Sequence, residues 1–143
     1  MKKIILATSF ACLFIVACKK GDKVRDDSVT IAGVWKADST RTVEYNGNTV
    51  VDDYVIKFTN ATIDFKTDGR FLFTYPGEPA EGGTYLYNAS AKTLSLKYDT
   101  EAAFETGNLL ELTARKMVVQ AEVNYNPPSF GITREVATLY FSR

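Results

Sequence analysis

The chain has 143 residues, with 17 basic and 17 acidic side chains, 2 cysteines and no histidine. Without a basic excess it has no strong attraction for a phosphate backbone, which argues against nucleic-acid binding. The absence of histidine removes the commonest general base and the commonest metal ligand, so catalytic triads that need imidazole are excluded and zinc chemistry is disfavoured. We therefore expect no enzymatic activity, no metal site and no cofactor.

The start of the chain predicts an export signal over residues 1–17. Two lysines precede an apolar run over residues 4–17, which is shorter than the roughly 20 residues that a membrane-spanning helix needs. The run ends in Ile15-Val16-Ala17-Cys18, which resembles the bacterial lipobox. We expect a cleaved lipoprotein signal peptide and acyl chains, palmitate among them, on Cys18. The alternative is an ordinary secretory signal in which this cysteine occurs by chance.

Residues 18–30 are expected to form the lipidated cysteine and a flexible tether, because this polar stretch has too little apolar content to pack. More than one acyl chain on Cys18 would make membrane attachment effectively permanent. By resemblance to common sorting rules of bacterial lipoproteins, Lys19 in place of an aspartate after the cysteine favours the outer membrane. The predicted location is the cell envelope, with a globular domain held away from the lipid surface.

Residues 31–143 have a length that suits a single domain. Their dominant pattern is period-two alternation in short runs, rich in aromatic and β-branched residues and separated by turn residues. Asn46-Gly47-Asn48, Asp68-Gly69 and Asn88-Ala89-Ser90 predict turns, since Asn and Gly tolerate positive φ. Asn60 predicts one more turn.

In chain order, the expected strands lie in the runs Gly33–Tyr45, Tyr54–Phe58, Ile63–Phe65, Phe71–Tyr75, Gly83–Tyr87, Leu94–Tyr98, Leu110–Leu112, Met117–Tyr125 and Thr133–Phe141. Residues 99–106 predict a short helical turn with Phe104 facing inward, and residues 126–129 predict a rigid loop. Eight or nine strands with short links favour an all-β, single antiparallel up-and-down barrel. The alternative is a sandwich with Greek-key connections.

Several short motifs, in this order, resemble the lipocalin-like domains of small bacterial lipoproteins: Ile31–Lys36 with its Gly-x-Trp, Ile63–Phe71, Gly82–Tyr85, Leu110–Thr113 and Leu139–Arg143. In lipocalins the Gly-x-Trp of the first strand closes one end of the barrel, and a basic residue of the last strand packs over the indole. The resemblance implies that Gly33, Trp35 and either Arg143 or Arg134 form this closing set, a structural role.

Two functions remain open from the residues. The first is binding of a small apolar or amphipathic molecule, in a pocket lined by Tyr54, Phe65, Phe73, Tyr75, Tyr85, Tyr98 and Tyr125; these rings could equally fill a small barrel. The second is a non-enzymatic structural or interaction lipoprotein with a filled barrel, which uses Tyr125, Pro127, Pro128 and Phe130 as an aromatic anchor for a partner. In both cases we expect a monomer attached to the membrane by its lipid.

Overall fold

A computed structural model describes residues 29–143, so the predicted signal peptide, Cys18 and most of the tether lie outside the described residues. Eight antiparallel strands pair in chain order, and the last strand pairs with the first to close a barrel. The strands are β1 (Gly33–Asn46), β2 (Thr49–Phe65), β3 (Arg70–Thr74), β4 (Glu81–Asn88), β5 (Thr93–Tyr98), β6 (Glu105–Leu112), β7 (Lys116–Ser129) and β8 (Ile132–Ser142). The predicted up-and-down barrel is confirmed, and the sandwich alternative is wrong.

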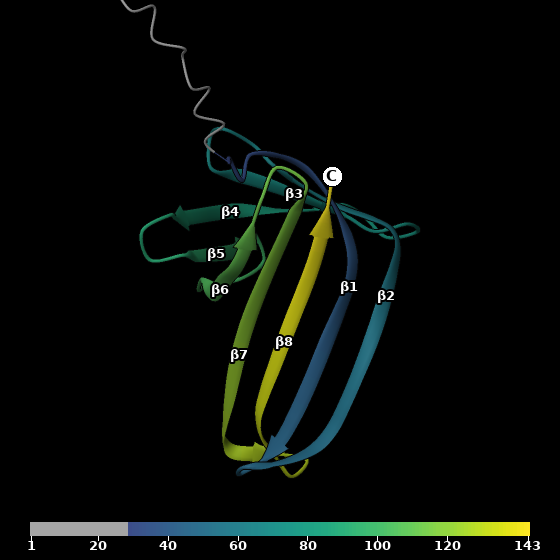
Figure 1. Cartoon of the computed structure of the whole chain (residues 1–143), viewed down its shortest axis with the longest axis vertical. Helices are drawn as coiled ribbons and strands as arrows, with labels where there is room; N and C mark the ends of the chain where they lie inside the picture. The colour runs from purple at the N-terminus through teal and green to yellow at the C-terminus, as the bar shows by residue number, and fades with distance from the viewer. Residues whose placement is uncertain (1–28) are drawn as a thin grey trace, which may run out of the picture.

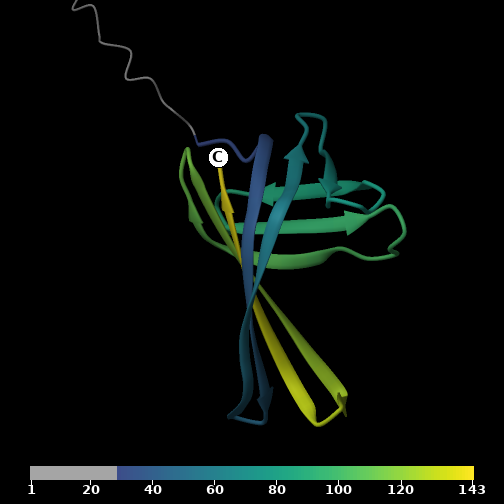
Figure 2. The same ribbon diagram turned by 90° about the vertical axis from the view of Figure 1, so that its right-hand side faces the viewer.

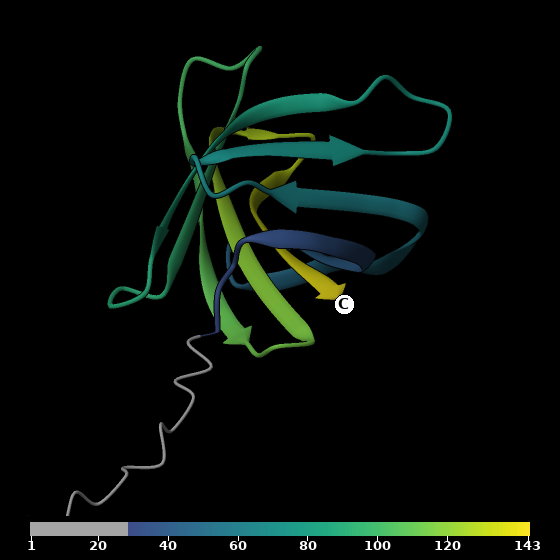
Figure 3. The same cartoon turned by 90° about the horizontal axis from the view of Figure 1, so that it is seen from above.

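The barrel is asymmetric because four of its strands are much longer than the others. β7, β8, β1 and β2 run side by side and continue well past the short strands β4, β5 and β6 (Figure 1). The short strands run across the long ones in the view of Figure 2, and Figure 3 looks down on the barrel from the end at which the C-terminus lies. We call the extended part of the four long strands the long-strand wall: residues 39–46, 49–57, 121–129 and 132–138.

The short links form where the sequence predicts them. Gly47, with φ of 60°, and Asn48 connect β1 to β2, and Asn46 pairs with Thr49 across that link. Gly69, with φ of 83°, closes the β2–β3 link, where its N–H donates to the carbonyl oxygen of Lys66. Positive φ is nearly free of steric cost for glycine, which is why these positions can turn so tightly.

Asn60 does not end a strand, which corrects the sequence prediction. It has φ of 58° and lies inside β2, at a point where Ala37 pairs with Ala61 but Ser39 pairs with Lys57. The extra residues of β2 form a bulge, and bulges bend a strand and strengthen its twist. The chain therefore continues as one 17-residue strand from the body of the barrel into the long-strand wall.

Two other predictions about links are wrong. Residues 99–104 are turn and bend without helix, and the ring of Phe104 is exposed, with the Nζ of Lys97 5.5 Å from its centre. Residues 126–129 belong to β7 instead of forming a separate loop. Among residues 29–143, no helix is long and apolar enough to cross a membrane.

Candidate functional site

One end of the barrel is closed by Trp35, which is completely buried. The indole Nε1 donates to the carbonyl oxygen of Ile31 at 2.7 Å, and the guanidinium carbon of Arg143 lies 3.7 Å from the centre of the ring. The Nη2 of Arg143 also donates to the carbonyl oxygens of Ile31 at 3.1 Å and of Ala32 at 2.7 Å. The chain before β1 is thus held across this end by hydrogen bonds and a cation–π contact.

The other residues implied for this closing set lie as follows. Gly33 has φ of 115°, a conformation that side chains rarely allow, and a Cβ there would come into ordinary contact with the Nη2 of Arg143 at 3.4 Å, so the backbone conformation is what requires glycine. Arg134 lies elsewhere, on the outer face, with its guanidinium carbon 3.9 Å from the centre of the Tyr45 ring. Of the two arginines left open by the sequence, Arg143 is the one that covers Trp35.

An apolar cavity of about 160 Å³ lies inside the barrel. Ile63, Leu94, Val119 and Leu139 contribute to its walls, whereas Trp35 is not among the lining residues. Glu105 and Thr106 also line the cavity and are themselves exposed, so the cavity reaches solvent at the end opposite Trp35, which we call the open end. Apolar cavities of roughly 150 Å³ are large enough to bind a benzene-sized group.

The structure separates the seven aromatic residues predicted to bind a ligand. Phe65 and Tyr98 line the cavity. Phe73 and Tyr85 pack against the buried core, and the Tyr85 hydroxyl donates to the carbonyl oxygen of Lys66 at 2.7 Å. Phe73 and Tyr85 do not line the cavity, and neither do the other three. Tyr54 and Tyr125 are in the long-strand wall, and Tyr75 lies beside Phe58 in the link after β3.

The inner face of the long-strand wall continues the cavity toward the open end. Residues paired directly across antiparallel strands share a face of the sheet. One such row contains Val119, Leu139, Thr40 and Ile56, in the order β7, β8, β1 and β2, and the next contains Ala121, Ala137, Thr42 and Tyr54. Val119, Leu139 and Ala121 line the cavity, which shows that these rows face inward.

The third row of this face carries three carboxylates. Val123 pairs with Glu135, Glu135 with Glu44, and Glu44 with Asp52. We call Glu135, Glu44 and Asp52 the carboxylate row. Like charges directly opposite one another on neighbouring strands destabilise a sheet by roughly 0.2–1 kcal/mol per pair. No lysine or arginine of the described residues forms a salt bridge with any of the three.

Two tyrosine hydroxyls lie against the carboxylate row. The Tyr125 hydroxyl donates to Glu135 at 3.0 Å, and the Tyr54 hydroxyl lies 3.5 Å from Glu44. The pKa of Tyr125 is raised, first because its hydroxyl is hydrogen-bonded to Glu135 and then through desolvation and the negative charges of Glu135 and Glu44. The two rings flank the row with apolar surface.

Two further carboxylates face inward on the short-strand side of the open end. Glu81 pairs with Phe73, and Glu105 pairs with Leu96, both inward-facing. Burial raises the pKa of Tyr98, and the charges of Glu81 and Glu105 raise it further, which indicates that both carboxylates lie near that hydroxyl. Acidic side chains therefore stand on both sides of the opening.

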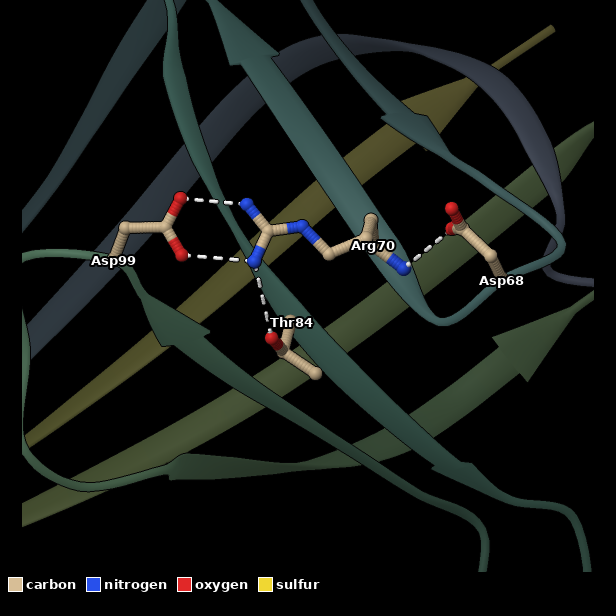
Figure 4. Close-up of polar contacts among 4 residues, drawn as sticks. All are labelled: Asp68, Arg70, Thr84 and Asp99. Atoms are coloured by element: carbon tan, nitrogen blue, oxygen red, sulfur yellow. Dashed lines mark hydrogen bonds and ion pairs between the residues drawn. The ribbon is translucent and has the colours of Figure 1, made fainter.

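On the outer surface, by contrast, several acidic residues form salt bridges with arginine or lysine. Arg70 at the start of β3 contacts both carboxylate oxygens of Asp99, at 2.9 and 2.6 Å, and also lies 3.4 Å from the Thr84 hydroxyl (Figure 4). These hydrogen bonds hold the pKa of the Asp99 carboxyl below its usual range. Arg41 likewise binds Asp53 on the outer face of the wall. Such exposed pairs contribute little to stability.

Comparison with solved structures finds the same type of barrel in a crustacyanin, which is a lipocalin. Apocrustacyanin C1 matches with a TM-score of 0.52 and 19% sequence identity, over 84% of this chain and 64% of that chain. The fold is lipocalin-like. Lobster apocrustacyanin A1 matches with a TM-score of 0.47 and 19% identity, over 83% of this chain and 62% of that chain. The match thus spans less than two thirds of the length of either neighbour.

No family model and no curated protein matches the sequence of this lipocalin-like barrel. At 19% identity the structural likeness extends to the fold. The cavity and the carboxylate row therefore have to be interpreted from this chain's own residues. Sequence reasoning missed Glu44, Glu135, Glu81 and Glu105, because their common orientation depends on the pairing of strands that are distant in sequence. The one available signal was that Glu44 and Glu135 lie within alternating runs instead of in turns.

Proposed function

We propose that this protein is a membrane-anchored lipocalin-like lipoprotein that binds a small apolar or amphipathic molecule in the cell envelope. The observation that supports binding most directly is the apolar cavity, which reaches solvent at the open end while Trp35 and Arg143 close the other end. If the barrel served only as a stable scaffold, side chains that filled this cavity would stabilise it, because voids in a core cost packing energy. The absence of enzymatic activity stays a prediction.

The anchoring half of the proposal rests on the sequence. The lysine-flanked apolar run and the lipobox-like Ile15-Val16-Ala17-Cys18 support a signal peptide over residues 1–17 and acylation of Cys18. The described structure begins at residue 29, a short distance from β1 at the closed end. A tether over residues 18–30 would then join the barrel at its closed end and leave the open end free to receive a ligand.

Filling the cavity should abolish ligand binding without unfolding the barrel. Ala121 lines the cavity, and Ala121→Phe is expected to place a ring in that space. Residues 19–143 would be incubated with a cell-envelope lipid and metabolite extract, and native and denatured masses compared. We expect an adduct that is lost on denaturation, and at least a tenfold lower adduct fraction in Ala121→Phe, about 1.4 kcal/mol of lost binding energy.

Asn124→Phe, on the outer face of the same strand, is the matched control. A bare native mass with varied extracts would argue against binding.

Replacing Cys18 should release the protein from membranes. Without the thiol there is no acceptor for the acyl chains, whose buried methylenes contribute roughly 0.8 kcal/mol each to membrane attachment. With the full chain expressed in a bacterial host, we expect the natural protein in the carbonate-washed membrane fraction with an acylated intact mass, and Cys18→Ala in the soluble fraction. Cys12→Ala, inside the predicted signal peptide, should behave as the natural chain. Membrane retention of Cys18→Ala would contradict the anchor.

One observation favours the interaction hypothesis as a second candidate. Phe130, at the tip of the β7–β8 hairpin, is fully exposed and has φ of 49°, an unfavourable conformation for a bulky residue. Asn-Gly is the favoured pair at such a turn, so we expect Phe130→Asn to stabilise the protein by a few tenths of a kcal/mol. If the ring anchors a partner, in-cell crosslinking to that partner should be lost in Phe130→Asn; unchanged crosslinks would argue against this role.

A further inference from the structure

All charged side chains that the strand register directs inward at the open end are acidic. Glu135, Glu44 and Asp52 lie on the long-strand wall, and Glu81 and Glu105 lie on the short strands. Within residues 29–143, the arginines and lysines of this region face outward instead: Arg41 binds Asp53 and Arg134 stacks on Tyr45. The links 75–80 and 99–104 contain no basic residue. An opening with one sign of charge and apolar walls concentrates the electric field of its charges.

Apolar surface connects the cavity to these charges. From Leu139 and Val119 in the cavity wall, the inner face continues through Ala121 and Ala137 to the carboxylate row. Glu135 is two residues beyond Ala137, so its Cα is roughly 7 Å further along the strand. A molecule with an apolar end and a charged end separated by such a distance could contact both surfaces at once.

Thr42 places a polar group on this path. It is the one buried polar residue in the described part of the chain, 5% exposed, in the row between the cavity and the carboxylate row. The Thr42 hydroxyl has no hydrogen-bond partner among residues 29–143. No fully buried side-chain polar atom in this part of the chain lacks a partner, so the Thr42 hydroxyl is not fully buried and remains accessible from the inner face. Such a group is available to a ligand that lies along the wall.

We propose that the ligand of this barrel is a cationic amphiphile, an organic ammonium or guanidinium compound whose apolar part occupies the cavity and whose charged group lies against the carboxylate row. This inference rests on the proposed binding function and specifies its ligand class. The cation relieves the repulsion between Glu44 and Glu135, which face each other without a basic partner. The rings of Tyr54 and Tyr125 supply the aromatic surface on which organic cations bind.

An organic cation fits this place better than a metal ion. Among the described residues, no three acidic side chains converge closely enough to hold a metal. A hard divalent cation requires six or more oxygen ligands or retained water, whereas an ammonium group requires only nearby carboxylates and can carry its own apolar chain. The combination of an apolar cavity with spread carboxylates is therefore matched by an amphiphile.

The test uses three probes that share a phenyl ring and a four-carbon linker: 4-phenylbutylammonium, 4-phenylbutanol and 5-phenylpentanoate. The mature full chain in phosphatidylcholine nanodiscs would be titrated calorimetrically at low salt, with empty nanodiscs subtracted. We expect the ammonium probe to bind about tenfold more tightly than the alcohol, because two or three partly exposed charge pairs add modest attraction each. Its advantage should shrink at high salt, which screens exposed charges. The pentanoate should bind most weakly.

The variant Glu44→Gln/Glu135→Gln identifies the residues responsible. Its ammonium and alcohol affinities should fall within about twofold of each other, while the alcohol affinity stays near that of the natural chain. Without ligand, the variant should be at least as stable to heat, since it loses a repulsive pair, so impaired folding cannot explain its result. Glu122→Gln, an outer-face residue next to Val123, should keep the preference for ammonium.

The outcomes distinguish the two proposals. If none of the three probes binds, both the binding function and the cationic ligand are overturned. If the alcohol or the pentanoate binds as tightly as the ammonium, the binding function stands and the cationic preference is wrong. If the ammonium preference persists in Glu44→Gln/Glu135→Gln, the Glu44–Glu135 pair is not its origin and the proposed placement is overturned.

Discussion

Trp35→Ala is expected to lower the free energy of unfolding by about 3–5 kcal/mol, the range for truncating a large buried aromatic residue. Trp35 has no exposed surface, and its removal would leave a cavity in the core cluster that also contains Met117 and Phe65. It would also remove the hydrogen bond to Ile31 and the ring that covers the Arg143 guanidinium. Arg143 would then lose its aromatic partner.

This loss should be measured by urea unfolding followed with far-ultraviolet circular dichroism, because Trp35 is the only tryptophan and its fluorescence disappears in the variant. Val34→Ala, at the adjacent outward-facing position that is 56% exposed, is the matched control and should change stability by no more than about 0.5 kcal/mol. A loss below about 1 kcal/mol for Trp35→Ala would show that the closed end does not depend on the indole.

Gly83→Ala should be the most damaging single-methyl change in the barrel. A Cβ at Gly83 would lie 2.4 Å from the carbonyl oxygen of Lys97 and 2.4 Å from a ring carbon of Phe71. The first of these atoms belongs to the backbone of the paired strand β5, so relief requires β4 and β5 to separate. We expect a cost of about 3 kcal/mol, the upper end of the usual range for overpacking.

The neighbouring Gly82→Ala is the control that separates a steric effect from the loss of a flexible glycine. Its added Cβ would meet the Asp99 carboxylate at 3.1 Å and the Arg70 guanidinium at 3.5 Å, both side-chain groups near the surface (Figure 4). These can move by a few tenths of an ångström, so we expect a cost of less than about 1 kcal/mol. Equal losses in both variants, measured by urea unfolding, would contradict the clash at Gly83.

The strands and tight turns could be predicted from the sequence because their determinants are local. Alternation of apolar and polar residues is visible within one strand, and Gly47 and Gly69 occupy turns that need positive φ. Asn60 carries the same kind of signal but is a bulge, since β1 continues beside β2 through this point and supplies partners on both sides of it. A turn residue alone cannot reveal whether a neighbouring strand continues.

The candidate site was mostly beyond sequence prediction for a related reason. In β1 the inward positions are Trp35 and Ala37 before the bulge and Thr40, Thr42 and Glu44 after it, so the inward set changes from odd to even numbers. A reader of the sequence cannot locate that change, and without it the carboxylate row is invisible. Aromatic residues were found by type, but type does not distinguish Phe65 in the cavity from Tyr75 outside it.

The length of the four wall strands has a consequence for self-association. Beyond the body of the barrel, β2 pairs only with β1 and β7 only with β8, which leaves two sheet edges with unpaired backbone groups. Free edges invite a second chain to add a strand. The edge on β7 carries Pro127 and Pro128, which have no N–H to donate to an added strand. The edge on β2 carries Asp52 and Asp53, whose charges would repel an identical edge. These residues discourage aggregation along the wall, which favours the expected monomer.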